Sequence, residues 1–110
     1  MTDEEAMKCV DYIRDHAPIY AKAKAKRVFI ENGLKSTKAK LMAQETGTLG
    51  AKEIYAYSHP EYETVLRGLE EAVQIEEEIK YRMDAAKLKF EYYKIQSFNQ
   101  RSESRMMSNV

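Results

Sequence analysis

The chain has 110 residues, which suits one domain with a modest core. Its 44% hydrophobic and 33% charged residues exclude a disordered chain, which is less apolar, and a membrane protein, which carries fewer charges. The 18 basic and 18 acidic residues cancel, so binding to nucleic acid would need a local basic patch.

The cysteine content and the absence of apolar runs predict the compartment. Cys9 is the single cysteine, so no disulfide can form within the chain, which favours a reducing environment. The opening MTDEEAMKCV is acidic and unlike a signal peptide. No stretch approaches the roughly 18 apolar residues of a membrane span. We therefore expect a cytoplasmic protein that does not enter a membrane.

The composition favours an all-α fold, because Gly and Pro number only four and two while good helix formers are plentiful. The first helix is expected near residues 3–15, within an N-terminal segment 1–16. Thr2 and Glu5 have the spacing of a capping box. Its apolar positions follow helical periodicity on one face: Ala6, Met7, Val10 and Ile13.

Pro18 predicts a break or kink, and a basic helix of residues 18–45 is expected after it, within segment 17–46. This helix contains the alternating run YAKAKAKRVF. Two apolar strips separate its lysines, so we expect a neighbour on both sides. One strip contains Ala21, Ala25, Val28, Ala39 and Ala43, and the other contains Ala23, Ile30, Leu34 and Leu41.

A connector, residues 47–58, begins in the glycine-containing TGTLG and continues as a short helix, AKEIYAYS. In SHPEYE, Ser58 and Glu61 have capping-box spacing, and Pro60 suits a first helical turn. A last helix is expected over residues 59–101, ending near 100, with a frayed tail at 102–110. Short connections favour antiparallel neighbours. The expected fold is an antiparallel helical hairpin with a very long C-terminal helix.

The last helix carries a heptad seam like that of a coiled coil. Nine of its eleven positions are apolar or aromatic, and Glu76 is the exception in the middle. The eleven positions are Tyr62, Val65, Leu69, Ala72, Glu76, Ile79, Met83, Ala86, Phe90, Tyr93 and Ser97. Core packing is the simplest role for this seam.

A second apolar stripe lies roughly opposite the seam in the C-terminal half of the last helix. It consists of Tyr81, Leu88, Tyr92 and Ile95. A helix that is apolar on two sides is expected to be covered on two sides. Because the rest of a short chain can hardly cover both, we predict a homo-oligomer, a dimer or higher, with these four residues at its interface.

Charge is segregated along the chain. Residues 17–44 contain seven basic residues and one acid (+6), and residues 61–78 contain seven acids and one base (−6). Complementary flanks of one hairpin are the favoured explanation. Binding of DNA or a partner protein is the alternative, with two candidate sets of contacts: Lys22, Lys24, Lys26 and Arg27, and the less neutralised Lys87, Lys89, Lys94 and Arg101.

The sequence contains no recognisable catalytic motif. The two histidines, His16 and His59, and Cys9 have no metal-ligand spacing, and no glycine-rich phosphate loop or paired nucleophile and base is present. The sequence therefore predicts a protein that is not an enzyme and needs no cofactor.

Three stretches resemble small helical proteins of tailed bacteriophages. They are AKAKAKRVFIENGLKSTKAKLMAQ, AYSHPEYETVLRGLEEAV and RMDAAKLKFEYYKIQSFNQR, with Tyr57, His59, Pro60, Glu61 and Tyr62 as the most specific positions. The resemblance implies an accessory protein in the host-cell cytoplasm that assists DNA recombination or replication by binding a protein or single-stranded DNA. The alternatives are a phage inhibitor of a host enzyme or defence complex and a structural coiled-coil element.

Overall fold

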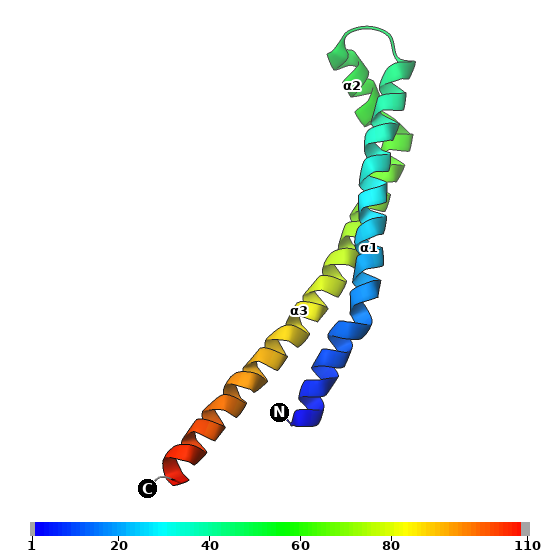
Figure 1. The fold of residues 1–110 in the computed structure, drawn as a ribbon. Coiled ribbons are helices and arrows are strands. Elements are labelled where there is room, and N and C mark those ends of the chain that lie inside the picture. The colour runs from blue at the N-terminus through cyan, green and yellow to red at the C-terminus, as the bar shows by residue number, and fades with distance from the viewer. Residues whose placement is uncertain (1, 109–110) are drawn as a thin grey trace. The chain divides into compact units, whose positions relative to one another are not determined.

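The computed structural model describes residues 2–108, which fold into three helices (Figure 1). They are α1 (Asp3–Gln44), α2 (Leu49–Ser58) and α3 (Pro60–Ser108), and no strand occurs among these described residues. The all-α prediction is confirmed. Met1, Asn109 and Val110, at the ends of the predicted first segment and tail, lie outside the described residues.

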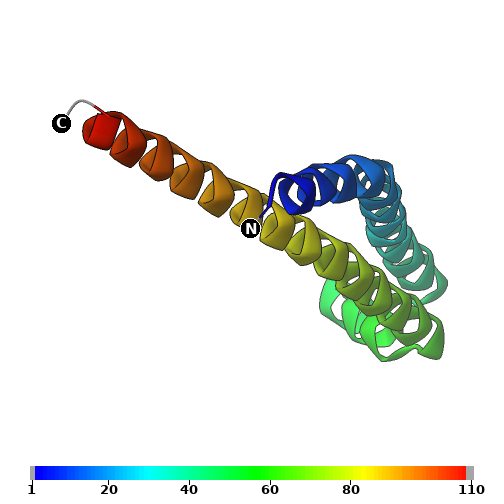
Figure 2. The ribbon, with the colours of Figure 1, turned by 90° about the horizontal axis from the view of Figure 1, so that it is seen from below.

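The helices form two compact units. Residues 20–78 make up one unit, and residues 2–19 and 79–108 make up the other. Within each unit a stretch of α1 lies beside a stretch of α3 that runs in the opposite direction (Figures 1 and 2). The antiparallel hairpin and its long C-terminal helix are therefore as predicted.

The predicted capping box opens α1. The backbone N–H of Glu5 donates to Oγ1 of Thr2 at 3.2 Å, and the backbone N–H of Thr2 donates to Oε2 of Glu5 at 3.3 Å. Two amides that have no partner within the helix are thereby satisfied. Asp3, Glu4 and Glu5 add negative charge in the first turn, where the helix dipole favours it.

Of the break or kink predicted at Pro18, the break does not occur, because α1 continues as a helix through this residue. Pro18 lacks the N–H that would reach the carbonyl of Arg14, but both residues are exposed, so water can solvate that carbonyl. Ile13, His16 and Tyr20 are partly buried on either side of it. Packing of these side chains offsets the local cost of proline, which is about 3 kcal/mol within a helix.

The connection between α1 and α2 follows the sequence signals. Gly47 has a φ of +115°, a conformation that side-chain-bearing residues rarely adopt. Thr48 then caps α2, with its hydroxyl accepting the backbone N–H of Ala51 at 3.2 Å. The short helix predicted in the connector is therefore present.

The start of α3 differs from the predicted capping box. Ser58 belongs to α2, and its hydroxyl donates to the carbonyl of Ile54 at 2.7 Å. The backbone N–H of Glu61 instead donates to Nδ1 of His59 at 3.1 Å. His59 thus takes the role expected of Ser58, because the extended backbone at His59 already separates the two helices.

The C-terminal tail is not frayed as far as the structure describes it, since α3 continues to Ser108. Residues 102–108 contain no Gly or Pro and include Met, Arg and Glu, which are good helix formers. Arg105 also places a positive charge in the last turn, where the helix dipole favours it.

The predicted seam of α3 is covered along its length. None of its eleven residues is exposed, and Ala72, Glu76, Met83 and Ala86 are buried. The alternation of three and four residues therefore identifies the face of α3 that packs within the chain.

The basic helix is covered on one side only. Ala23, Ile30 and Leu34 are partly buried and Leu41 is 1% exposed, as one predicted strip requires. The other strip, at positions 21, 25, 28, 39 and 43, is exposed, so the chain itself supplies no second neighbour there. In the N-terminal part of α1, Ala6 is buried, Val10 and Ile13 are half-buried, and Met7 is exposed.

An ion pair crosses the middle of the seam in the unit of residues 20–78. Nε and Nη2 of Arg27 donate to the two carboxylate oxygens of Glu76, at 2.6 and 3.2 Å. Nη1 of Arg27 also donates to Glu31 at 2.9 Å. These hydrogen bonds, led by those to Glu76, raise the pKa of Arg27 further above its ordinary value. The exceptional glutamate of the heptad pattern therefore has a matching arginine on α1.

Replacement of Glu76 tests the importance of this pair. Glu76→Ala should lower the free energy of unfolding by about 1–3 kcal/mol, because Arg27 loses its buried partner. Arg27→Met combined with Glu76→Leu should recover most of the loss, since an apolar pair suits the surrounding seam. Urea unfolding followed by circular dichroism measures both, and Glu71→Ala, at an exposed position of the same helix, is the control. Equal stability of Glu76→Ala and the control would contradict this role.

Candidate interaction surfaces

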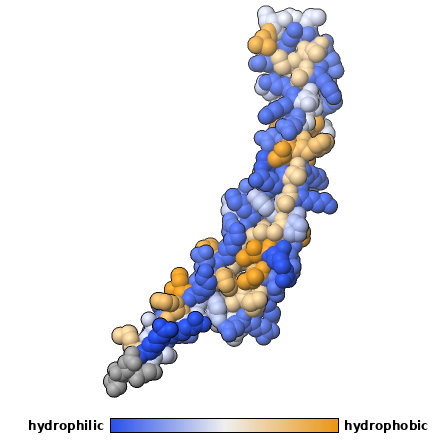
Figure 3. Space-filling view, viewed as in Figure 1, coloured by the Kyte–Doolittle hydropathy of each residue, from blue (hydrophilic) through white to orange (hydrophobic). Residues whose placement is uncertain are grey.

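The four predicted interface residues form an exposed apolar stripe on α3, which we call the outer stripe. Tyr81 is 66% exposed, Leu88 69%, Tyr92 60% and Ile95 59%. All four lie on the stretch of α3 that belongs to the unit of residues 2–19 and 79–108. Figure 3 shows patches of apolar surface along the C-terminal part of α3. The structure confirms that the chain leaves these side chains uncovered.

The outer stripe has the size of the apolar centre of a protein interface. A buried aromatic side chain contributes about 150–250 Å². At 66% and 60% exposure, Tyr81 and Tyr92 alone present roughly 200–300 Å², to which Leu88, Ile95 and Met106 add further apolar surface. Apolar patches of a few hundred Å² are the largest on a typical monomer and are often functional. A standard interface needs roughly 800 Å² per partner, of which such a patch would form the apolar centre.

Sequence reasoning missed the continuation of this stripe. Ala85, Asn99, Ser102 and Met106 are exposed and extend the outer stripe by steps of three and four residues. Asn99 and Ser102 are polar, so a search for apolar periodicity passes over them. A hydrogen bond also orients the side chain of Tyr92 on this face, because its hydroxyl accepts from Nε2 of Gln96 at 3.1 Å.

The C-terminal basic candidates fall on different faces of α3. Lys87, Lys94 and Arg101 recur every seven residues, and Lys80 precedes them with the same spacing. All four are exposed, and they form a cation row about 31 Å long at 1.5 Å per residue. The Nζ of Lys94 lies 5.5 Å from the ring centre of Phe90. Lys89 does not belong to this row, because two residues along a helix turn a side chain by about 200°.

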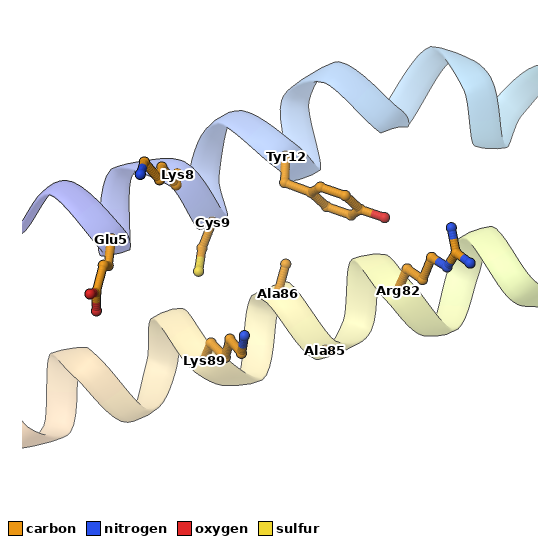
Figure 4. A pocket seen from close by; sticks show the side chains of 8 residues that line it. All are labelled: Glu5, Lys8, Cys9, Tyr12, Arg82, Ala85, Ala86 and Lys89. Atoms are coloured by element: carbon orange, nitrogen blue, oxygen red, sulfur yellow. The ribbon is translucent and has the colours of Figure 1, made fainter. Parts of the chain in front are cut away.

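Lys89 instead lines a groove of about 490 Å³ between α1 and α3 in the unit of residues 2–19 and 79–108 (Figure 4). The side chain of Cys9 points across the groove toward α3, where Ala85 and Ala86 leave room because they are small. The remaining lining residues are Glu5, Lys8, Tyr12 and Arg82. The groove combines a largely apolar floor with charged side chains at its edge.

The N-terminal basic candidates differ in their exposure. Lys22, Lys24 and Lys26 are exposed, whereas the side chain of Arg27 is only 25% exposed and is paired with Glu76 and Glu31. Arg27 is therefore not part of an exposed basic surface, which corrects its assignment as a candidate nucleic-acid contact. The predicted pairing of basic and acidic flanks is confirmed for Arg27. In the described residues the ion pairs involve arginines, not these lysines.

The distinctive residues of AYSHPEYE have structural roles at the junction of α2 and α3. The rings of Tyr57 and Tyr62 meet edge to face, with centres 5.3 Å apart, and His59 caps α3. The Nζ of Lys38 lies 4.7 Å from the ring centre of Tyr57, and hydrogen bonding to Tyr57 raises the pKa of Lys38. Local packing therefore accounts for these residues.

No family model matches this chain, no curated protein is significantly similar to it, and no solved structure matches it. The resemblance to tailed-phage proteins therefore stays a prediction. Within residues 2–108, no cluster of three or more His, Cys, Asp or Glu side chains could hold a metal ion. In the same part of the chain, no helix has the length and apolar character needed to cross a membrane.

Removal of the N-terminal lysine charges tests the role of YAKAKAKRVF. Lys22→Gln, Lys24→Gln and Lys26→Gln should each change the free energy of unfolding by less than about 0.5 kcal/mol, because exposed charges without close partners contribute little. Arg27→Gln should lower the thermal midpoint clearly, since it removes the pair with Glu76. Thermal melts by circular dichroism compare them. A lysine triple variant that melts below Arg27→Gln would show that the lysines stabilise the hairpin.

Proposed function

We propose that this chain is a non-enzymatic accessory protein that works by binding and that it self-associates through the outer stripe. The observation that carries the proposal is the exposure of Tyr81, Leu88, Tyr92 and Ile95, each at least 59%. These side chains are spaced to form one continuous face of a helix, and a soluble surface rarely holds so many apolar residues in a row. Burial against a partner would remove this surface from water.

A second copy is the best-supported partner for the outer stripe. The stripe is apolar along its centre and has both acidic and basic residues at its edges, including Asp84, Glu91 and Lys89. Such a surface is complementary to itself, as the interface of a two-fold dimer must be. The proposed role in DNA recombination or replication rests on the resemblance to tailed-phage proteins, and it is consistent with a helical binding protein.

Polar substitution of the outer stripe tests self-association. Leu88→Ser, Tyr92→Ser and Ile95→Ser together should lower the sedimenting mass to that of a monomer while leaving helical content largely intact, because these residues make few contacts within the chain. The matched control is Leu49→Ser, Phe29→Ser and Ile54→Ser, three equally exposed apolar residues in the other unit. A wild-type protein that sediments as a monomer at high concentration would contradict the proposal.

Binding of single-stranded DNA is a second candidate function, favoured by the cation row of Lys80, Lys87, Lys94 and Arg101. Regularly spaced exposed cations can neutralise phosphates along one strand, and aromatic side chains nearby can stack on bases. Phe98 is 70% exposed on the same stretch of α3, outside the outer stripe, and supplies such a ring. This function is compatible with self-association, since the row lies to one side of the outer stripe.

The salt dependence of binding tests this candidate. Neutralising four phosphates per chain should give a slope of about −3 for log K against log salt concentration, because each contact on single strands contributes about −0.7. Lys87→Gln with Lys94→Gln should reduce the slope by about half. Fluorescence anisotropy with a labelled oligonucleotide measures it, and Lys22→Gln with Lys24→Gln is the control. If the slope changes only when Lys22 and Lys24 are replaced, the DNA-binding surface lies on α1 and not on the cation row.

A further inference from the structure

We infer that the outer stripe joins two copies of this chain as a parallel coiled coil, with α3 of each copy in the same direction and the same register. The inference rests on the proposed self-association and adds the orientation of the two chains. It is carried by a second heptad pattern on α3, by a polar residue within that pattern, and by the charges at its edges.

The second pattern is a complete heptad repeat over 26 residues. Its alternating steps of four and three residues place eight residues on one face, and every one of them is exposed. They are Tyr81, Ala85, Leu88, Tyr92, Ile95, Asn99, Ser102 and Met106. The first seam of α3 already packs within the chain, so this second repeat is available to another helix.

Asn99 favours the parallel arrangement. In a parallel pair in register, each residue of the repeat faces its counterpart, so the two Asn99 amides can donate to and accept from each other. An asparagine at one core position is known to select the register of parallel dimers. In an antiparallel pair, Asn99 would face Tyr81, Leu88 or Ile95 of the second copy, which leaves its amide against an apolar or aromatic side chain.

The charged edges favour the same arrangement. Asp84 and Glu91 lie on one edge of the repeat, and Lys89 and Gln96 lie on the other. In a parallel coiled coil, a residue on the first edge meets the residue five positions later on the other helix. Asp84 would therefore meet Lys89 of the second copy, and Glu91 would meet Gln96 of the second copy, with each contact made twice by symmetry.

The antiparallel alternative brings like charges together. In the antiparallel register with the most apolar contacts, Leu88 of each copy packs against Tyr92 of the other copy. In that register each edge faces the same edge of the second copy, so Glu91 meets Glu91 and Lys89 meets Lys89 of the other chain. Like charges at these positions oppose association, whereas the parallel form converts the same residues into attractive pairs.

Site-directed disulfide formation tests the orientation. In a chain with Cys9→Ser, Ser102→Cys places one thiol at a position that faces its counterpart only in the parallel form. Mild oxidation should give a disulfide-linked dimer in at least tenfold higher yield than Gln100→Cys, which points away from the repeat. A dimer in sedimentation without the Ser102→Cys disulfide would overturn the parallel arrangement, whereas a monomer in sedimentation would overturn the proposed self-association itself.

A charge swap tests the edge contacts without changing the apolar stripe. Lys89→Glu should weaken association by roughly 2-fold to 30-fold, because two symmetric pairs become repulsive. Adding Asp84→Lys should restore it, since the swapped charges attract again in the parallel form. Helical content by circular dichroism verifies that both variants fold. Failure of the second change to restore association would overturn the pairing of Asp84 with Lys89.

Discussion

The ion pair between Arg27 and Glu76 is the constraint around which the helical hairpin is organised. It lies in the middle of a seam whose other positions are mostly apolar, and it joins residues 49 positions apart in the sequence. A one-position slip of either helix would bury the carboxylate of Glu76, which is 5% exposed, against apolar side chains. Apolar residues can pack in several registers of two helices. The Arg27–Glu76 pair makes two hydrogen bonds and can form in only one register.

The same pair joins the basic stretch of α1 to the acidic stretch of α3. One arginine with its carboxylate partners holds the register, while the surrounding lysines and glutamates stay in water. Exposed charges contribute little individually because water screens them and long side chains lose freedom when they pair. The alternation in YAKAKAKRVF is therefore a solvated helix surface that contains one structurally important residue, Arg27.

The long α3 helix carries two heptad repeats with different roles. Its first repeat packs within the chain along both units, and its second repeat is exposed in the unit of residues 2–19 and 79–108. A helix with two such faces can join an internal hairpin to an external partner without further elements. The outer stripe and the cation row lie on separate sides of the same helix, so the proposed self-association would leave the cation row exposed.

The sequence by itself determined the helical class, the Thr2–Glu5 cap, the seam of α3 and the outer stripe. These features depend on local spacing, which a single helix enforces wherever it lies. Only the tertiary structure decided that Arg27 faces Glu76, because residues of distant segments meet only when the helices pair. It also decided that α1 continues through Pro18 and that His59, in place of Ser58, caps α3. Each of these outcomes depends on the packing and solvent exposure around the residue, and neither can be derived from local helix propensity.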